Sequence, residues 1–186
     1  MESLWDKVVS FHGHACPGLA QGLRASLLAM KLLDVTRDED EELVVVTEND
    51  ACGVDAIQWV TGCTAGKGNL VFLNYGKSAY TFYSRAKKRG VRIVMEKVSP
   101  PQTGEYQGMS ESEKRAEAIK QLLSMSLEEG MRVEEVEVLP PKPARIFDSV
   151  TCQVCGERVM EPRARIKGGQ VVCLPCSDPY RARWDG

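Results

Sequence analysis

Two groups of cysteine and histidine residues have the types and spacing of metal ligands. Near the carboxyl end, two C-x-x-C pairs flank residues 156–172, a separation typical of zinc sites built from four cysteines; they are Cys152, Cys155, Cys173 and Cys176. Each C-x-x-C turn directs two sulfurs to one centre, and two such turns complete a tetrahedron with no open position. We therefore predict a structural zinc ion. Iron in a rubredoxin-like site is the alternative metal, and buried cysteines without a ligand are the alternative without metal.

The second group lies near the amino end, where both histidines of the chain fall close together beside a cysteine. His12, His14 and Cys16 precede Pro17, a residue suited to the first position of a helix. Cys16 is thereby placed at the helix N-cap, where free amides and the helix dipole favour a thiolate. We take Cys16 and His14 as candidate catalytic residues. His12 is a weaker candidate ligand, because it can equally cap a helix or pack.

Two further cysteines are candidates for the same site. Cys52 precedes a predicted helix, and Cys63 lies in the glycine-containing loop 61–69. We expect one or both to converge with His14 and Cys16 on a metal or a reactive-thiol site, and imidazole with thiolate suits zinc. The alternative is that both are small buried core residues.

Charged residues nearby extend the candidate site. Asp55, together with Glu48 and Asp50, is placed to orient a histidine or to transfer a proton, unless these are solvated loop carboxylates. Lys67 stands between glycines and is either a contact for an anionic ligand or an ordinary turn lysine. The loop is not a Walker motif, because Gly68 occupies the place of the magnesium-binding Ser or Thr and a strand follows.

The elements that must position these residues are short helices and strands. Apolar residues at helical spacing predict helices over residues 4–11, 17–33, 55–61 and 112–129, with Gly130 ending the last. Runs rich in β-branched and aromatic residues predict strands over 43–47, 70–75, 80–84, 91–98 and 133–139. Because these elements do not alternate as βαβ units, we predict an α+β fold with an antiparallel or mixed sheet and flanking helices.

A proline-rich segment separates the two groups of candidate ligands. Three of the residues 140–143 are prolines, which favour extended backbone and lack amide protons. We predict a core domain over 1–140, a linker over 141–149 and a zinc finger over 150–186. The finger, a zinc ribbon or treble clef, should contain a hairpin within 163–172 and a helix over 177–183.

Composition bounds the class of protein. The 186 residues include seven cysteines, and C-x-x-C pairs in a reducing compartment indicate metal binding rather than disulfides. There is no apolar run of membrane-spanning length and no secretion signal at the start, so we expect a cytoplasmic protein without a membrane partner. The net charge of −2 gives no strong field for a polyanion, which makes nucleic acid an unfavoured partner.

Several motifs closely resemble the FmdE family of formylmethanofuran dehydrogenase subunits. The matching segments are His12–Leu19 with Gly22 and Arg24, Cys52 with Asp55–Gln58, Thr61–Thr64 with Gly66–Leu70, and Tyr75–Lys77. The resemblance implies an α+β core followed by a zinc finger, an intertwined homodimer, and a core site built from the matched histidines and cysteines. It also implies association with the enzyme that reduces carbon dioxide onto methanofuran, whose molybdenum or tungsten pterin belongs to other subunits.

Three functions are compatible with these features. The first is a metal-binding accessory protein of a molybdenum- or tungsten-dependent oxidoreductase, with a second metal, for which zinc is suited, in the core and a protein partner at the zinc finger. The second is a metal- or redox-sensing regulator that contacts nucleic acid or a protein through arginines of the finger. The third is an enzyme that uses the Cys16 thiolate as a nucleophile or a zinc-bound water as a base.

Overall fold

The chain folds as two units, Met1–Ala144 and Arg145–Gly186. The computed structural model describes residues 3–96, 108–137, 140, 142, 143 and 145–178. Within the described part of the first unit, the helices are α1 (Leu4–His12), α2 (Pro17–Leu33), α3 (Gly53–Thr61) and α4 (Glu111–Ser124). The strands of that unit are β1 (Leu43–Thr47), β2 (Leu70–Phe72), β3 (Ala79–Ser84), β4 (Arg89–Met95) and β5 (Met131–Val136).

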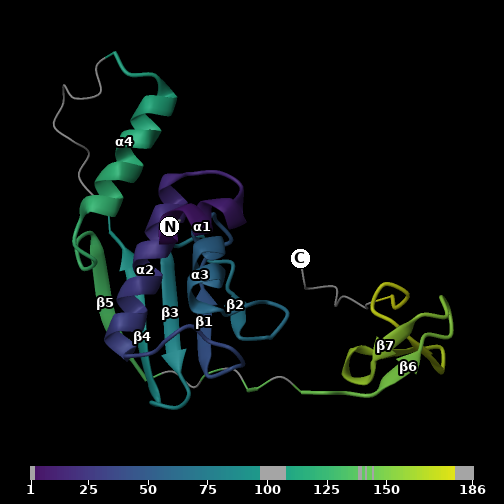
Figure 1. Ribbon diagram of the computed structural model, residues 1–186. Coiled ribbons are helices and arrows are strands. Elements are labelled where there is room, and N and C mark those ends of the chain that lie inside the picture. Colours follow the sequence, from purple (N-terminus) through teal and green to yellow (C-terminus); the bar gives the residue numbers. More distant parts are fainter. Residues whose placement is uncertain (1–2, 97–107, 138–139, 141, 144, 179–186) are drawn as a thin grey trace, which may run out of the picture. The chain divides into compact units, whose positions relative to one another are not determined.

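The five strands form one mixed sheet in the order β2-β1-β3-β4-β5 (Figure 1). β1 and β2 are parallel, and the other neighbouring pairs are antiparallel. Val45 lies opposite Phe82, and Phe82 lies opposite Val91, so that one face of the sheet carries a continuous apolar row. Because side chains alternate along a strand, this register decides which face is buried. The predicted α+β class with a mixed sheet is confirmed.

Helices α2 and α3 cover that apolar face. Leu28 of α2 and Ile57 of α3 are fully buried in the same cluster as Phe82 and Ile93 of the sheet. A second cluster joins Val8 of α1 to residues of α2 and α3, which places α1 against these helices. The sheet and two helices thus form a rigid base that holds the loops at the amino ends of α2 and α3.

Helix α4 ends earlier than predicted. Met125 is in extended conformation, and residues 126–130 form a turn before β5 instead of a fifth helical turn closed by Gly130. The buried Arg24 guanidinium donates hydrogen bonds to the carbonyls of Ser126 and Glu129 in this turn. This tertiary contact holds the turn by binding carbonyls that the end of a helix leaves without an internal partner.

The strands also differ from the predictions at their ends. β2 ends at Phe72 and is shorter than the predicted 70–75. β5 begins at Met131, two residues before the predicted 133–139, and ends at Val136, while residues 138 and 139 lie outside the described residues. β4 begins at Arg89 and ends at Met95, and residues 97 and 98 of the predicted strand lie outside the described residues. In the described segments, none of the helices has the length and apolar character needed to cross a membrane.

The second unit consists of two hairpins. β6 (Ser149–Thr151) pairs with β7 (Arg158–Met160), and β8 (Arg165–Lys167) pairs with β9 (Gln170–Val172). A 3₁₀ turn, η1 (Glu161–Arg163), joins them. Gly168 and Gly169 both have positive φ, which the tight β8–β9 turn requires, and the predicted hairpin is confirmed. Ser177 and Asp178 are not helical, and the rest of the predicted terminal helix lies outside the described residues.

Candidate metal centres

The end of α1 and the loop that leads to α2 present three of the candidate donors. Gly13 ends α1 in the left-handed conformation at φ 94°, so the chain turns sharply between His12 and His14. Cys16 is the N-cap of α2, with Pro17 in the first turn, as predicted. The amide of Leu19 donates a hydrogen bond to Cys16 Sγ at 3.3 Å, which orients the sulfur at the start of α2.

Cys52 reaches this loop because α2 and α3 make backbone contact. A Cβ atom added to Gly22 would lie 2.1 Å from the carbonyl oxygen of Gly53, so that no larger residue fits there. A Cβ atom on Gly18 would lie 3.6 Å from Cys52 Cβ. Gly22 therefore lets the first residues of α3 approach the first turns of α2, and Cys52 comes to lie beside Cys16.

The His12 imidazole is fixed by a carboxylate. Its Nδ1 atom lies 2.7 Å from Asp55 Oδ2, and the amide of Gln58 donates to the other oxygen of that carboxylate at 3.1 Å. The opposite ring nitrogen, Nε2, is buried and has no hydrogen-bond partner among the residues that the structure describes. With the proton on Nδ1, a lone pair on Nε2 is left to a ligand, which is the usual arrangement of a metal-bound histidine.

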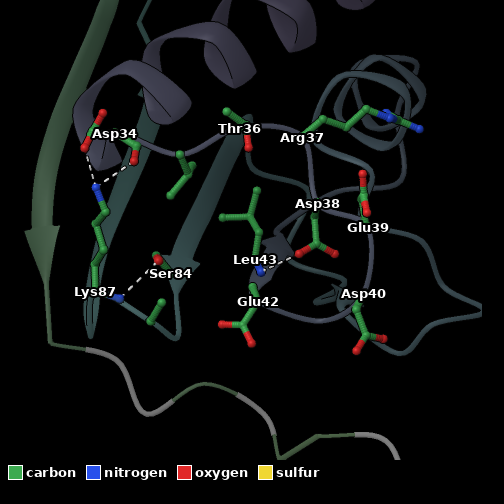
Figure 2. A pocket seen from close by; sticks show the side chains of 12 residues that line it. Asp34, Thr36, Arg37, Asp38, Glu39, Asp40, Glu42, Leu43, Ser84 and Lys87 are labelled. Atoms are coloured by element: carbon green, nitrogen blue, oxygen red, sulfur yellow. Dashed lines mark hydrogen bonds and ion pairs between the residues drawn. The ribbon is translucent and has the colours of Figure 1, made fainter.

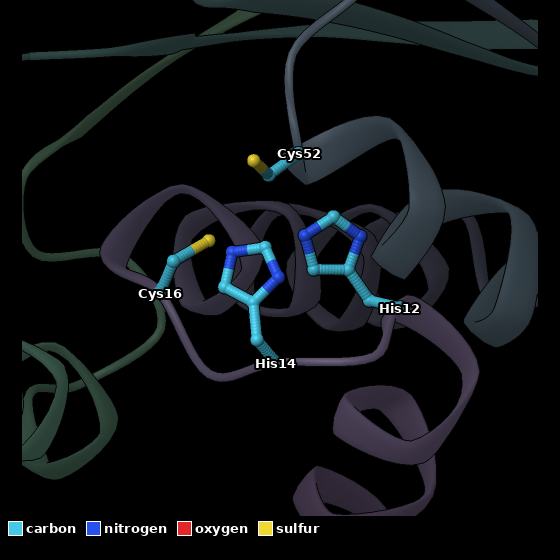
Figure 3. A group of neighbouring side chains, drawn as sticks. All are labelled: His12, His14, Cys16 and Cys52. Atoms are coloured by element: carbon cyan, nitrogen blue, oxygen red, sulfur yellow. The ribbon is translucent and has the colours of Figure 1, made fainter.

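Figure 3 shows the resulting cluster, in which the side chains of His12, His14, Cys16 and Cys52 converge. Their donor atoms all lie within 4.8 Å of one another, and the two imidazole rings are 4.5 Å apart. Zinc bonds of about 2.0–2.3 Å separate tetrahedral ligands by roughly 3.3–3.8 Å, so a small inward movement satisfies such an ion. Two nitrogens and two sulfurs form a donor set that fits zinc.

The environment of Cys52 also favours a cation. Burial raises the pKa of the Cys52 thiol, and the adjacent Cys16 sulfur raises it further. Two sulfurs this close resist simultaneous ionisation, because like charges repel in a partly buried site. A divalent ion between them removes this repulsion and stabilises both thiolates.

Cys63 does not join the cluster. It is fully buried in the core beneath β1, and its thiol donates to the Leu43 carbonyl at 3.2 Å. Burial raises the pKa of Cys63 to about 12, so this sulfur stays protonated at neutral pH. The sequence left open whether Cys52, Cys63 or both join the site, and the structure places Cys52 there and Cys63 in the core.

Lys67 is engaged by the protein itself. Its ammonium lies 2.9 Å from Asp38 Oδ2, and the Asp38 carboxylate is almost completely buried. Asp38 in turn belongs to a separate hollow of about 430 Å³ shown in Figure 2, where it accepts from the Leu43 amide and where Asp34 pairs with Lys87. The structure therefore places Lys67 in an ion pair and not at the histidine–cysteine cluster.

The other two candidate carboxylates lie outside the cluster. Glu48 is buried and paired with Arg92, with Oε1 2.7 Å from Nε. Asp50 is exposed. Of the three acidic residues that the sequence offers, the structure brings only Asp55 to a histidine.

The four cysteines of the second unit form the other centre. Cys155 Sγ and Cys173 Sγ lie 3.8 Å apart, and the four sulfurs lie within 4.8 Å of one another. The backbone amides of Cys155 and Cys173 lower the pKa of Cys152 to about 6, whereas the neighbouring thiols raise the pKa of Cys176 to about 12. Ionisation of one sulfur therefore disfavours ionisation of its neighbours, and a central cation removes the repulsion between the thiolates.

Comparison with known proteins follows the same division of the chain. A family model described as "FmdE, Molybdenum formylmethanofuran dehydrogenase operon" matches residues 11–139. The chain belongs to the FmdE family. Residues 145–181 of this FmdE protein match the prokaryotic dksA/traR C4-type zinc finger, which assigns the four-cysteine module to a zinc-finger family.

Two relatives match nearly the whole chain. A probable S-adenosyl-L-methionine-binding protein of Archaeoglobus fulgidus is 34% identical over 196 residues, covering 92% of this chain and 52% of the relative. The chain thus spans about half the length of that relative. The crystal structure of a tungsten formylmethanofuran dehydrogenase FmdE-like protein from Syntrophus aciditrophicus is similar with a TM-score of 0.67 and 26% identity, over 92% of this chain and 88% of that one.

Two features of the core site are stronger in the structure than the sequence indicates. His12 is the weakest candidate from the sequence, yet its buried Nε2 and its contact with Asp55 make it the best oriented donor. Gly18 and Gly22 carry no separate role in the sequence prediction. Their spacing of four places both on one face of a helix, which is the signal that another backbone approaches there.

Proposed function

We propose that this FmdE protein is a metal-binding accessory protein whose core holds a zinc ion through His12, His14, Cys16 and Cys52. The observation that carries the proposal is the buried His12 Nε2, which has no partner in the described part of the chain, in a ring whose Nδ1 is held by Asp55. A buried polar atom without a partner is costly, and a metal ion supplies the missing interaction. The four-cysteine module holds a second, closed zinc that stabilises its fold.

The accessory role draws on the family and on the relative with a solved structure. That relative is described as similar to a subunit of a tungsten formylmethanofuran dehydrogenase. By analogy, the core would act beside a molybdenum- or tungsten-dependent oxidoreductase, and the chain would assemble as a homodimer. Methanogenesis-related chemistry and a cytoplasmic location belong to the same proposal.

The exposure of His14 supports a second candidate function. His12, Cys16 and Cys52 are buried or half-buried, whereas His14 is exposed and lies on the loop between α1 and α2. Movement of His14 would leave three protein ligands and an open position, as in catalytic zinc sites. A zinc ion in such a site supplies Lewis acidity, and Asp55 would hold the proton on His12 Nδ1.

Metal analysis of two matched variants tests the proposal. The purified wild-type chain should contain two zinc ions, and Cys16→Ser should contain one while the circular dichroism of the core is retained. Cys152→Ser should also contain one, and the amides of residues 149–172 should lose their hydrogen-exchange protection. Equal zinc content in Cys16→Ser and the wild type would rule out the core centre.

A further inference from the structure

The zinc module carries a hollow that its own metal site does not use. It encloses about 710 Å³ beside strand β8 and is lined by Arg165, Ile166, Lys167, Leu174, Ser177 and Asp178. Ile166 is 71% exposed and Leu174 is 43% exposed. We call Arg165, Ile166, Lys167 and Leu174 the β8 surface.

Strand β8 offers a backbone edge for pairing. In the described residues of the module, β8 pairs with β9 alone, and all three residues of β8 are exposed. An open edge presents unpaired N–H and C=O groups to which an extended segment can add as a further strand. Side chains of β8 alternate, so Arg165 and Lys167 lie on one face and Ile166 on the other.

The apolar side chains of the module are unusually exposed. Of the twelve large hydrophobic side chains that are exposed among the described residues, five belong to residues 145–178. They are Ile146, Val154, Met160, Ile166 and Leu174. Ile166 and Leu174 line the hollow at β8. Exposed apolar side chains beside an open strand edge are typical of a surface that contacts another protein.

Charge decides what kind of protein segment fits. Arg165 and Lys167 flank Ile166, and Asp178 is the one acidic residue among the described residues that line the hollow. Over residues 145–186, seven basic residues stand against five acidic ones, so the module lacks the strong positive field that attracts nucleic acid. Two local cations around an exposed isoleucine instead complement carboxylates that alternate with apolar side chains.

We propose that β8 binds an extended acidic segment of a partner protein, in which carboxylates alternate with apolar residues. The segment adds to the free edge of β8, its carboxylates pair with Arg165 and Lys167, and its apolar side chains contact Ile166 and Leu174. This inference rests on the accessory role proposed above and names the surface that serves it. It does not require the core metal.

The probe is a fluorescein-labelled peptide of alternating Asp or Glu with Leu or Val, titrated into the full zinc-loaded chain by fluorescence anisotropy. Arg165→Glu should weaken binding about tenfold, and Ile166→Ser should weaken it similarly. Arg158→Glu is the matched control, because it makes the same charge change on β7, away from the hollow. It should leave the affinity within about twofold of wild type. Zinc content verifies that each variant keeps its fold.

Three comparison probes define the outcomes that overturn the inference. They are the same peptide with Lys in place of the acids, the peptide with Ser in place of the apolar residues, and a short DNA duplex. Equal or tighter binding of any of these contradicts the proposal, as does the absence of saturable binding of the acidic peptide. Cys16→Ser should bind the peptide as wild type does, so loss of the core metal site and loss of the β8 surface are separable results.

Discussion

Asp55 Oδ2 accepts the Nδ1 proton of His12 across 2.7 Å, joining the end of α1 to the first turn of α3. This contact fixes the tautomer and the plane of the ring before a metal arrives. It also ties two helices that are more than forty residues apart in the sequence. The geometry of the core centre therefore depends on a residue that is not itself among the four donors.

We expect Asp55→Asn to weaken zinc binding at the core about 10- to 100-fold. The uncharged amide is a weaker acceptor for the Nδ1 proton of His12 than the carboxylate is. The dissociation constant is measured by competition with a chromophoric chelator, and Cys152→Ser, which lacks the four-cysteine site, serves as the background for both variants. Asp50→Asn is the control, since Asp50 is exposed and outside the cluster. Equal affinities of the two variants would show that Asp55 does not position the ligand.

We expect Gly22→Ala to destabilise the core by about 1–3 kcal/mol and to lower its zinc content, because the new methyl group meets the Gly53 carbonyl. The backbone cannot yield without moving Cys52 away from Cys16. Denaturant unfolding gives the stability change, and metal analysis gives the second effect. Gly66→Ala, where an added Cβ meets nothing within 4 Å, should change neither quantity.

The Glu48–Arg92 pair should make the core sensitive to acid. The Arg92 hydrogen bonds lower the pKa of Glu48 below its ordinary value of 4.5. A carboxyl group with a depressed folded-state pKa contributes stability above pH 4.5, and this contribution is lost as the pH falls through the lower folded-state value. Glu48→Gln should remove about 2 kcal/mol at pH 7 and much less near pH 3.

Unfolding curves of wild type and Glu48→Gln at both pH values test this prediction. Glu135→Gln is the control, because Glu135 pairs with Arg89 at the exposed end of the sheet. A stability difference between wild type and Glu48→Gln that is the same at pH 3 and pH 7 contradicts the assigned role of the charge.

We expect Cys63→Ala to leave the zinc content of the core unchanged while lowering its stability by about 1 kcal/mol through the lost burial and the lost hydrogen bond to Leu43. In the native apo chain at neutral pH, Cys63 should react with iodoacetamide far more slowly than Cys16, because its sulfur is buried and protonated. Mass spectrometry of the labelled peptides measures both rates. Loss of core zinc in Cys63→Ala would show that Cys63 is a ligand of the core metal.

Local sequence patterns predicted most elements of the fold. Apolar periodicity located α1 and α2 closely, and the two glycines at 168 and 169 located the β8–β9 turn. The turn after α4 was not predicted in the same way, because it is held by Arg24, whose guanidinium donates to carbonyls about a hundred residues further along the chain. A propensity argument sees only the neighbours in sequence.

The amino-acid sequence by itself determined the four-cysteine module, because its ligands come in pairs whose separation is set by the C-x-x-C turn. It also determined the position of Cys16, since Pro17 and the N-cap are local features of a helix start. Only the tertiary structure showed that Cys52, and not Cys63, joins the cluster. It also placed His12 among the donors and paired Lys67 with Asp38. Those outcomes depend on how closely α2 approaches α3 and on which face of each element is buried, and both follow from the packing of the whole core.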